Sequence, residues 1–257
     1  MTAADTRVVV QPDKAALGEN VANRFVGLLA QLTQQSRPVH VSLTGGSMGV
    51  AVLGATAGHA WRDNIDWSLV HFWWSDERFV PRADPERNAG QARTALLAQL
   101  DVPAENVHEP AASDDGVTLD AAAAAYAAEL ARFAQSDDRP YPAFDVCFLG
   151  VGPDGHVASL FPDRGEVLVT DGTVLAVRDS PKPPPERVTF TRPVINGSAR
   201  VWMVLAGADK ASALGLVMAG ASYSSVPAAG AYGTEQTLVF TDAAAAAEVP
   251  EDLIDPD

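Results

Sequence analysis

The sequence has little of several features that would assign it to a class at once. It contains one cysteine, Cys147, inside an apolar run, so no disulfide framework or thiolate metal site is available. No apolar run approaches the length of a membrane span, and the first residues lack the basic and apolar regions of a signal peptide. These absences predict a protein of the reducing cytoplasm with no membrane partner.

Positive charge is also scarce. The chain carries 18 Lys and Arg against 33 Asp and Glu, a formal net charge of −15. Because a nucleic acid demands a basic surface, we expect no nucleic-acid partner. No pair among the 5 histidines has metal-ligand spacing and no carboxylate cluster joins one, so we expect no metal. The net negative charge of the chain repels an anionic small molecule. A site for such a ligand would therefore need several of the few cations close together.

What the sequence does have is an alternation of two apolar patterns. Short continuous apolar runs are typical of strands buried on both faces, and runs with helical spacing separate them. We expect strands at 7–11, 38–44, 69–74, 144–149, 200–207 and 237–240. We expect helices at 13–35, 47–58, 89–100, 117–134 and 209–219, with short strands around a proline-rich loop in 165–190.

This alternation predicts a Rossmann-like α/β fold, in which a mainly parallel sheet has helices on both faces. No linker-like change of composition divides the chain, so we expect one domain over 1–257. In such sheets ligands bind outside the carboxyl ends of the strands. The four segments at those ends are 44–49, 75–81, 150–156 and 207–210.

The segment 45-GGSMG-49 lies between an expected strand and an expected helix. It fits G-x-S-x-G, in which Ser47 would be a nucleophile, but only one strand precedes it and no oxyanion loop is found upstream. Glycines that let the backbone approach a ligand, followed by free N–H groups of a helix, make an anion site. We therefore favour a phosphate cradle of Gly45, Gly46 and Ser47, with Thr44 as a further hydroxyl donor, and keep the serine nucleophile as the alternative.

The segment 150-GVGPDGHVASLFP-162 admits three interpretations. Its G-x-G-x-x-G spacing fits a dinucleotide loop, but Pro162 comes too soon for the long helix that such a loop opens. It could be a glycine turn with an incidental histidine. In the interpretation we favour, Asp154 and His156 stand two residues apart at the end of a strand, where either could act as base or orienting group.

Four charged residues complete the candidate site. Arg78 has the planar fork that suits a phosphate or a developing oxyanion, and Asp76 would hold Arg78 or the hydroxyls of a substrate; the alternative is a solvated turn. Lys210 is expected in the first turn of a helix, where the dipole disfavours a cation and an anionic ligand would compensate. Arg187, just after the prolines, is a further candidate.

These segments together resemble the 6-phosphogluconolactonases. The motifs that carry the resemblance appear in the family's order, as 42-SLTGGS-47, 75-SDERFVP-81, 150-GVGPDGHVASLFP-162, 186-ERVTFT-191 and 203-MVLAGADKASAL-214. The related glucosamine-6-phosphate deaminases share the α/β fold and the D-G-H motif. In those enzymes a glutamate follows the motif histidine by five residues; Phe161 in that place favours the lactonase.

The resemblance implies hydrolysis of 6-phospho-D-glucono-1,5-lactone to 6-phospho-D-gluconate, a step of the oxidative pentose phosphate pathway, without a cofactor. His156 would be the general base on a water that attacks C1, and Asp154 would fix its tautomer or orient the water. Lys210 and the glycine cradle would anchor the phosphate.

Two other functions stay open. One is a sugar-phosphate isomerase or deaminase of the same fold. The other is a non-catalytic sugar-phosphate sensor, which normally carries a DNA-binding module for which this acidic chain has no spare segment. We expect a monomer or a weak homodimer.

Overall fold

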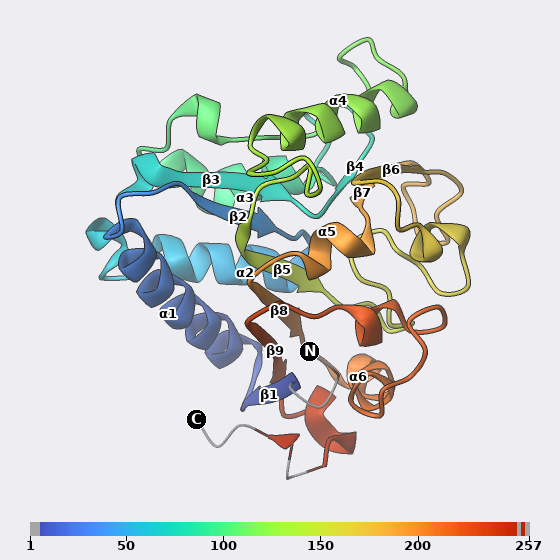
Figure 1. The fold of residues 1–257 in the computed structure, drawn as a ribbon. Coiled ribbons are helices and arrows are strands. Elements are labelled where there is room, and N and C mark those ends of the chain that lie inside the picture. The colour runs from blue at the N-terminus through green and yellow to red at the C-terminus, as the bar shows by residue number, and fades with distance from the viewer. Residues whose placement is uncertain (1–5, 251–252, 255–257) are drawn as a thin grey trace.

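The computed structural model describes residues 6–250 and 253–254 and contains a six-stranded parallel sheet (Figure 1). The order across the sheet is β1-β9-β8-β5-β2-β3, and every neighbouring pair is parallel. The strands are β1 (Thr6–Gln11), β2 (Val39–Leu43), β3 (Val70–Trp74), β5 (Phe144–Gly150), β8 (Arg200–Leu205) and β9 (Gln236–Asp242). From β2 the chain moves outward to β3, and from β5 onward it moves the other way. The topological switch point therefore lies between β2 and β5.

Helices cover both faces of this sheet, as the alternation predicts. One face packs against α1 (Lys14–Thr33), α2 (Gly46–Ala57) and α3 (Asn88–Ala95) in one apolar cluster. The other packs against α4 (Leu119–Arg132), α5 (Arg192–Asn196) and α6 (Ala211–Met218) in a second cluster. In Figure 1, α1 in blue and α4 in green lie far apart with the sheet between them.

Local sequence signals account for where the main helices begin. Asp13 precedes α1, and its carboxylate accepts the N–H groups of Ala15 and Ala16, each at 2.9 Å. Thr118 caps α4 through the N–H of Ala121. Such caps satisfy donors that a helix leaves unpaired at its first turn. The strands are held by burial instead: all five residues of β2 are buried, as are the first six of β5.

The short strands expected in 165–190 form a second, antiparallel sheet together with a strand at 76–78 that was not expected. It consists of β4 (Asp76–Arg78), β7 (Arg187–Phe190) and β6 (Val174–Val177), in the order β4-β7-β6. The 75–81 segment is therefore not the solvated turn of the alternative interpretation: β4 pairs with β7, a partner more than a hundred residues away in the chain. Such a pairing leaves no local pattern in so polar a segment. The short α5 was also missed, and the expected helix over 89–100 ends as α3 at Ala95, followed by a single turn at Leu97–Gln99.

No helix in the described part of the chain is both long and apolar enough to span a membrane.

Candidate active site

The segments at the carboxyl ends of β2, β5 and β8 meet at the switch point, where they line a cavity of about 220 Å³. Polar residues from the two sheets converge on this cavity. Nine of the ten residues expected at the site line it: Thr44, Gly45, Gly46, Ser47, Asp76, Arg78, His156, Arg187 and Lys210. The tenth, Asp154, lies directly behind His156.

Asp154 and His156 form a close pair in the loop after β5. Asp154 Oδ1 lies 2.5 Å from His156 Nδ1. Burial alone raises the pKa of Asp154, but hydrogen bonds and charge from His156 and Lys182 outweigh it and hold the pKa well below its ordinary value. Asp154 is therefore ionised at neutral pH and can accept a hydrogen bond from Nδ1–H. In a neutral imidazole this tautomer places the free lone pair on Nε2.

The loop that carries this pair depends on Gly152. A Cβ at Gly152 would overlap the imidazole of His156 and the carboxylate of Asp154, so only glycine lets the loop pass beneath the pair. No long helix follows it; a single turn, Gly165–Leu168, is the next helical element. The glycine spacing thus serves the Asp154–His156 pair and does not open the helix that a dinucleotide fingerprint requires.

The cradle begins where β2 ends. Gly45 is the N-cap of α2, and Ser47 lies exposed in its first turn. A Cβ at Gly45 would overlap the amide of Asn88, which packs against the cradle from α3. Thr44 Oγ1 accepts the N–H of Gly150 at 3.1 Å and so joins the ends of β2 and β5. Free N–H groups in the first turn of a helix are able to bind an anion.

Ser47 does not have the partner that a serine nucleophile needs. Among the hydrogen bonds within residues 6–250, none joins Ser47 to His156. These hydrogen bonds therefore give the nucleophile interpretation no support, and the cradle stays a prediction.

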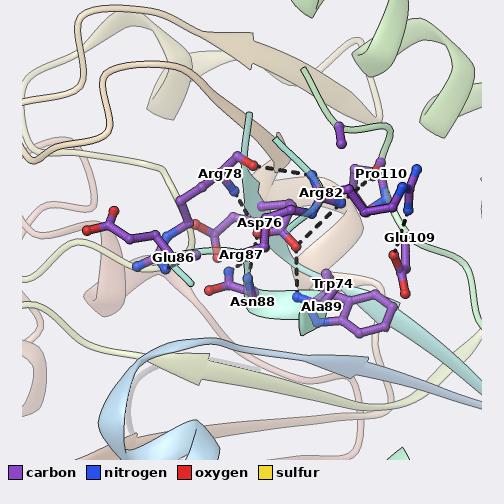
Figure 2. Close-up of polar contacts among 12 residues, drawn as sticks. Trp74, Asp76, Arg78, Arg82, Glu86, Arg87, Asn88, Ala89, Glu109 and Pro110 are labelled. Atoms are coloured by element: carbon purple, nitrogen blue, oxygen red, sulfur yellow. Dashed lines mark hydrogen bonds and ion pairs between the residues drawn. The ribbon is translucent and has the colours of Figure 1, made fainter. Parts of the chain in front are cut away.

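Asp76 and Arg78 are held in place by a buried network beneath them (Figure 2). Glu77, between them, accepts the N–H groups of Asn88 and Ala89 at the start of α3, each at 2.8 Å. Burial raises the pKa of Glu77 although Arg87, 3.8 Å away, opposes this. Tying β4 to α3 in this way turns the side chains on either side of Glu77 toward the cavity.

Asp76 has different partners from those expected. Its Oδ2 accepts the hydroxyl of Ser159 at 2.7 Å and lies 3.8 Å from Arg187 Nη1. Arg78 instead donates to the backbone carbonyl of Glu86 at 2.6 Å. Of the two roles expected for Asp76, the contact with Arg78 is not found among the described residues, because the pairing of β4 with β7 brings Arg187 to Asp76 instead. Its role toward the hydroxyls of a substrate stays a prediction.

Two cations at the cavity come from outside the sheet core. Lys210 ends the turn Ala208–Lys210 and is the N-cap of α6; its Nζ lies 3.3 Å from Asp209. Lys182, from the proline-rich loop, lies 3.1 Å from Asp154 Oδ1. Sequence reasoning missed Lys182, since a lysine among prolines carries no pattern of its own. Asn88 also lines the cavity and is buried.

Nothing in this site has the form of a metal centre. Within residues 6–250 and 253–254, no three His, Cys, Asp or Glu side chains are grouped as metal ligands would be. The chemistry available here is therefore a carboxylate-oriented imidazole opposite a group of cations and backbone donors.

Comparison with known proteins identifies the family. A family model described as glucosamine-6-phosphate isomerases/6-phosphogluconolactonase matches residues 12–240. The chain belongs to this family. It is 45% identical over 253 residues to the 6-phosphogluconolactonase of Streptomyces coelicolor, covering 97% of each chain.

Solved structures show the same fold. The 6-phosphogluconolactonase of Thermotoga maritima matches 92% of this chain and 99% of its own, with a TM-score of 0.79 and 26% identity. A monomeric glucosamine-6-phosphate deaminase matches 94% of this chain and 99% of its own, with a TM-score of 0.76. At 16% identity that second likeness concerns the fold alone.

Proposed function

We propose that this chain hydrolyses 6-phospho-D-glucono-1,5-lactone to 6-phospho-D-gluconate. The observation that carries the proposal is the Asp154–His156 pair, which faces a cavity bordered by the N-terminus of α2 and Lys210. The proposal also draws on the 6-phosphogluconolactonase from Streptomyces coelicolor, with which this chain shares 45% identity over nearly its whole length.

The phosphate binds to the cradle. The N–H groups of Gly46 and Ser47 and the hydroxyl of Ser47 donate to its oxygens, and Lys210 supplies a positive charge beside them. This local group of donors offsets the repulsion from a chain with a net charge of −15. Anchoring the phosphate fixes where the lactone ring lies relative to His156.

His156 is the general base. Nε2 takes a proton from a water molecule as that water attacks C1, and a tetrahedral oxyanion forms. When the bond between C1 and the ring oxygen breaks, the imidazolium returns the proton to that oxygen, which gives a carboxylic acid and a free hydroxyl. Asp154 holds the Nδ1 proton throughout and stabilises the imidazolium between the two steps.

Arg78, Asp76 and Arg187 complete the site. Arg78 supplies positive charge to the oxyanion or to the phosphate. Kinetics of a variant that lacks this charge separate the two roles: loss of the first lowers kcat, and loss of the second raises KM. Asp76, with one oxygen engaged by Ser159, accepts substrate hydroxyls with the other. Burial lowers the pKa of Arg187, whose contacts with neighbouring backbone carbonyls suit a supporting role behind Asp76.

Phe161 argues against the deaminase alternative. It is buried and its ring lies 4.7 Å from the ring of His156, so the position five residues after the histidine supplies no carboxylate.

The proposal includes one α/β domain over 1–257, a monomeric or weakly dimeric state, no cofactor, and a cytoplasmic location. Support for that location is the unpaired, buried Cys147, which suits a reducing compartment.

The decisive experiment follows the disappearance of 6-phosphogluconolactone by NMR, above its spontaneous hydrolysis. We expect fast turnover by the wild-type protein and a collapse of the rate in folded His156→Ala. Wild-type protein that is no faster than spontaneous hydrolysis would refute the lactonase, and amino-sugar phosphates and simple binding would then be screened.

The Ser47→Ala variant should keep its kcat; if it retains little activity, the serine nucleophile is correct.

A further inference from the structure

Lys182 makes contact with both members of the acid–base pair. Its Nζ lies 3.1 Å from Asp154 Oδ1 and 3.1 Å from His156 Nδ1. Because the imidazole also approaches the same Oδ1, two donors share one carboxylate oxygen. The ring of Phe161 also packs against the imidazole, with ring centroids 4.7 Å apart. Asp154, His156 and Lys182 thus form a group of three charged or polar side chains drawn from two separate loops.

The loop that carries Lys182 is held by a buried side chain. Arg187 Nε donates to the carbonyl of Pro184 at 2.8 Å, and its Nη2 donates to those of Pro183 and Lys182 at 2.9 and 3.1 Å. The hydroxyl of Ser180 donates to the same Lys182 carbonyl at 2.8 Å. The backbone of Lys182 is therefore anchored to the protein interior, which sets it apart from an ordinary surface lysine.

An ammonium at this point changes what Asp154 does to His156. A carboxylate beside an imidazole favours the protonated ring, and a protonated ring cannot accept a proton from water. A cation on the same carboxylate oxygen offsets that preference and leaves the hydrogen bond to Nδ1 in place. Asp154 can then orient the ring without holding it in the charged form.

We propose that Lys182 is a positioning residue that, through Asp154, keeps His156 in the neutral form that acts as a base. This role deepens the proposed function and rests on it. The remaining charged groups that line the cavity are Asp76, Arg78, Arg187 and Lys210. They are the same in every variant of the test, so a change in pH dependence reports on Lys182.

The test compares the pH profile of kcat/KM for wild type, Lys182→Met and Lys182→Arg with 6-phosphogluconolactone as substrate. In Lys182→Met we expect the acid limb to move to higher pH by about one unit. Lys182→Arg keeps the charge and should restore the wild-type limb. Arg178→Met is the matched control, because it removes one charge nearby, from an exposed ion pair with Asp120.

A second measurement does not require turnover. The ring protons of His156, assigned by their absence in His156→Gln, are titrated by NMR in the free protein. Their midpoint should rise in Lys182→Met and stay in place in Arg178→Met. If wild type lacks lactonase activity but this midpoint moves, the proposed function fails while the influence of Lys182 on the ring stands.

Three results would overturn the role of Lys182. An equal fall of kcat at every pH, with the limb unmoved, would mean that Lys182 contacts the reacting oxygen. A rise in KM alone would make it a phosphate ligand. Unchanged kinetics together with an unchanged ring titration would show that the contact has no consequence.

Discussion

Histidines lie at both ends of the parallel sheet, in opposite environments. His156 follows β5 at the carboxyl end, in a polar cavity beside Asp154 and Lys182. Toward the amino ends of β2 and β3, His40 and His71 are register partners whose rings stack 4.8 Å apart. His156 lines the active-site cavity, whereas His40 is buried and His71 is half-buried against aromatic rings.

The interior histidines are held by aromatic rings and by each other. His108 stacks on Trp73 with ring centroids 3.8 Å apart, and its Nε2 and Nδ1 lie 3.0 Å from His71 and 2.9 Å from Glu129. His40 Nδ1 accepts the indole N–H of Trp73 at 3.1 Å. Burial is the largest cause that lowers the pKa of His40 to about 3 and that of His108 to about 4.

The contrast teaches that the surroundings of a histidine decide its role. In the interior, burial removes the charged form and leaves a planar ring that packs and accepts hydrogen bonds. In the cavity, a carboxylate and an ammonium surround a ring that solvent and substrate can reach. Substitution of His156 should therefore affect the rate of turnover, and substitution of the histidines packed on aromatic rings should affect the free energy of unfolding.

The largest expected effect is on the rate in His156→Gln. We expect kcat to fall by about 10²–10⁴-fold, since general base assistance is lost. The free energy of unfolding should change by less than about 0.5 kcal/mol, because the side chain is not part of the core. Lactone turnover by NMR and urea unfolding measure the two. A large loss of stability with the rate retained would show that His156 has a structural role and not a catalytic one.

The converse substitution is His108→Ala. We expect the free energy of unfolding at pH 7.5 to fall by about 3 kcal/mol, because a buried ring on Trp73 and two hydrogen bonds are lost. Turnover per folded molecule should match wild type. Urea unfolding and kinetics at a single protein concentration test this. A variant that is as stable as wild type but inactive would show that His108 contributes to catalysis and not to stability.

Lys210→Met tests the cradle. We expect KM to rise by about 10- to 100-fold, since a charge-assisted contact with the phosphate is lost, and kcat to change little. Lys14→Met serves as the control, as it removes a charge from the exposed start of α1. If kcat falls and KM is constant, Lys210 interacts with the reacting centre and the phosphate lies elsewhere.

The smallest effect concerns acid stability. His108 protonates near pH 6.5 when unfolded but only near 4 when folded, so its share of stability is present above pH 6.5 and is lost as pH falls. At pH 5 we expect a loss on the order of 2 kcal/mol from this group, at about 1.4 kcal/mol per pH unit. His108→Gln, which does not titrate, should lose less between pH 7.5 and 5. Equal losses in urea unfolding would show that His108 does not contribute.

Much of the fold could be predicted from local pattern. The apolar runs locate all six strands of the parallel sheet to within a few residues, and helical spacing locates α1, α2, α4 and α6. The glycines near residue 150 and the Asp154–His156 spacing indicate a site because close backbone approach and acid–base chemistry require particular residue types. Those signals are contained in short segments.

The pairing of β4 with β7 and the place of Lys182 could not be predicted in this way. A three-residue polar strand has no periodicity, and its partner lies more than a hundred residues along the chain. Lys182 meets Asp154 because Arg187, buried at the start of β7, holds the intervening carbonyls. No spacing in the chain encodes such a contact.

By itself the sequence determined the alternation of strands and helices, and it predicts which end of the sheet binds a ligand and which histidine acts as a base. These depend on periodicity and on residue type, which are local properties. Only the tertiary structure decided which cations reach that histidine and which histidines are interior, because both depend on burial and distance between segments that the chain keeps far apart.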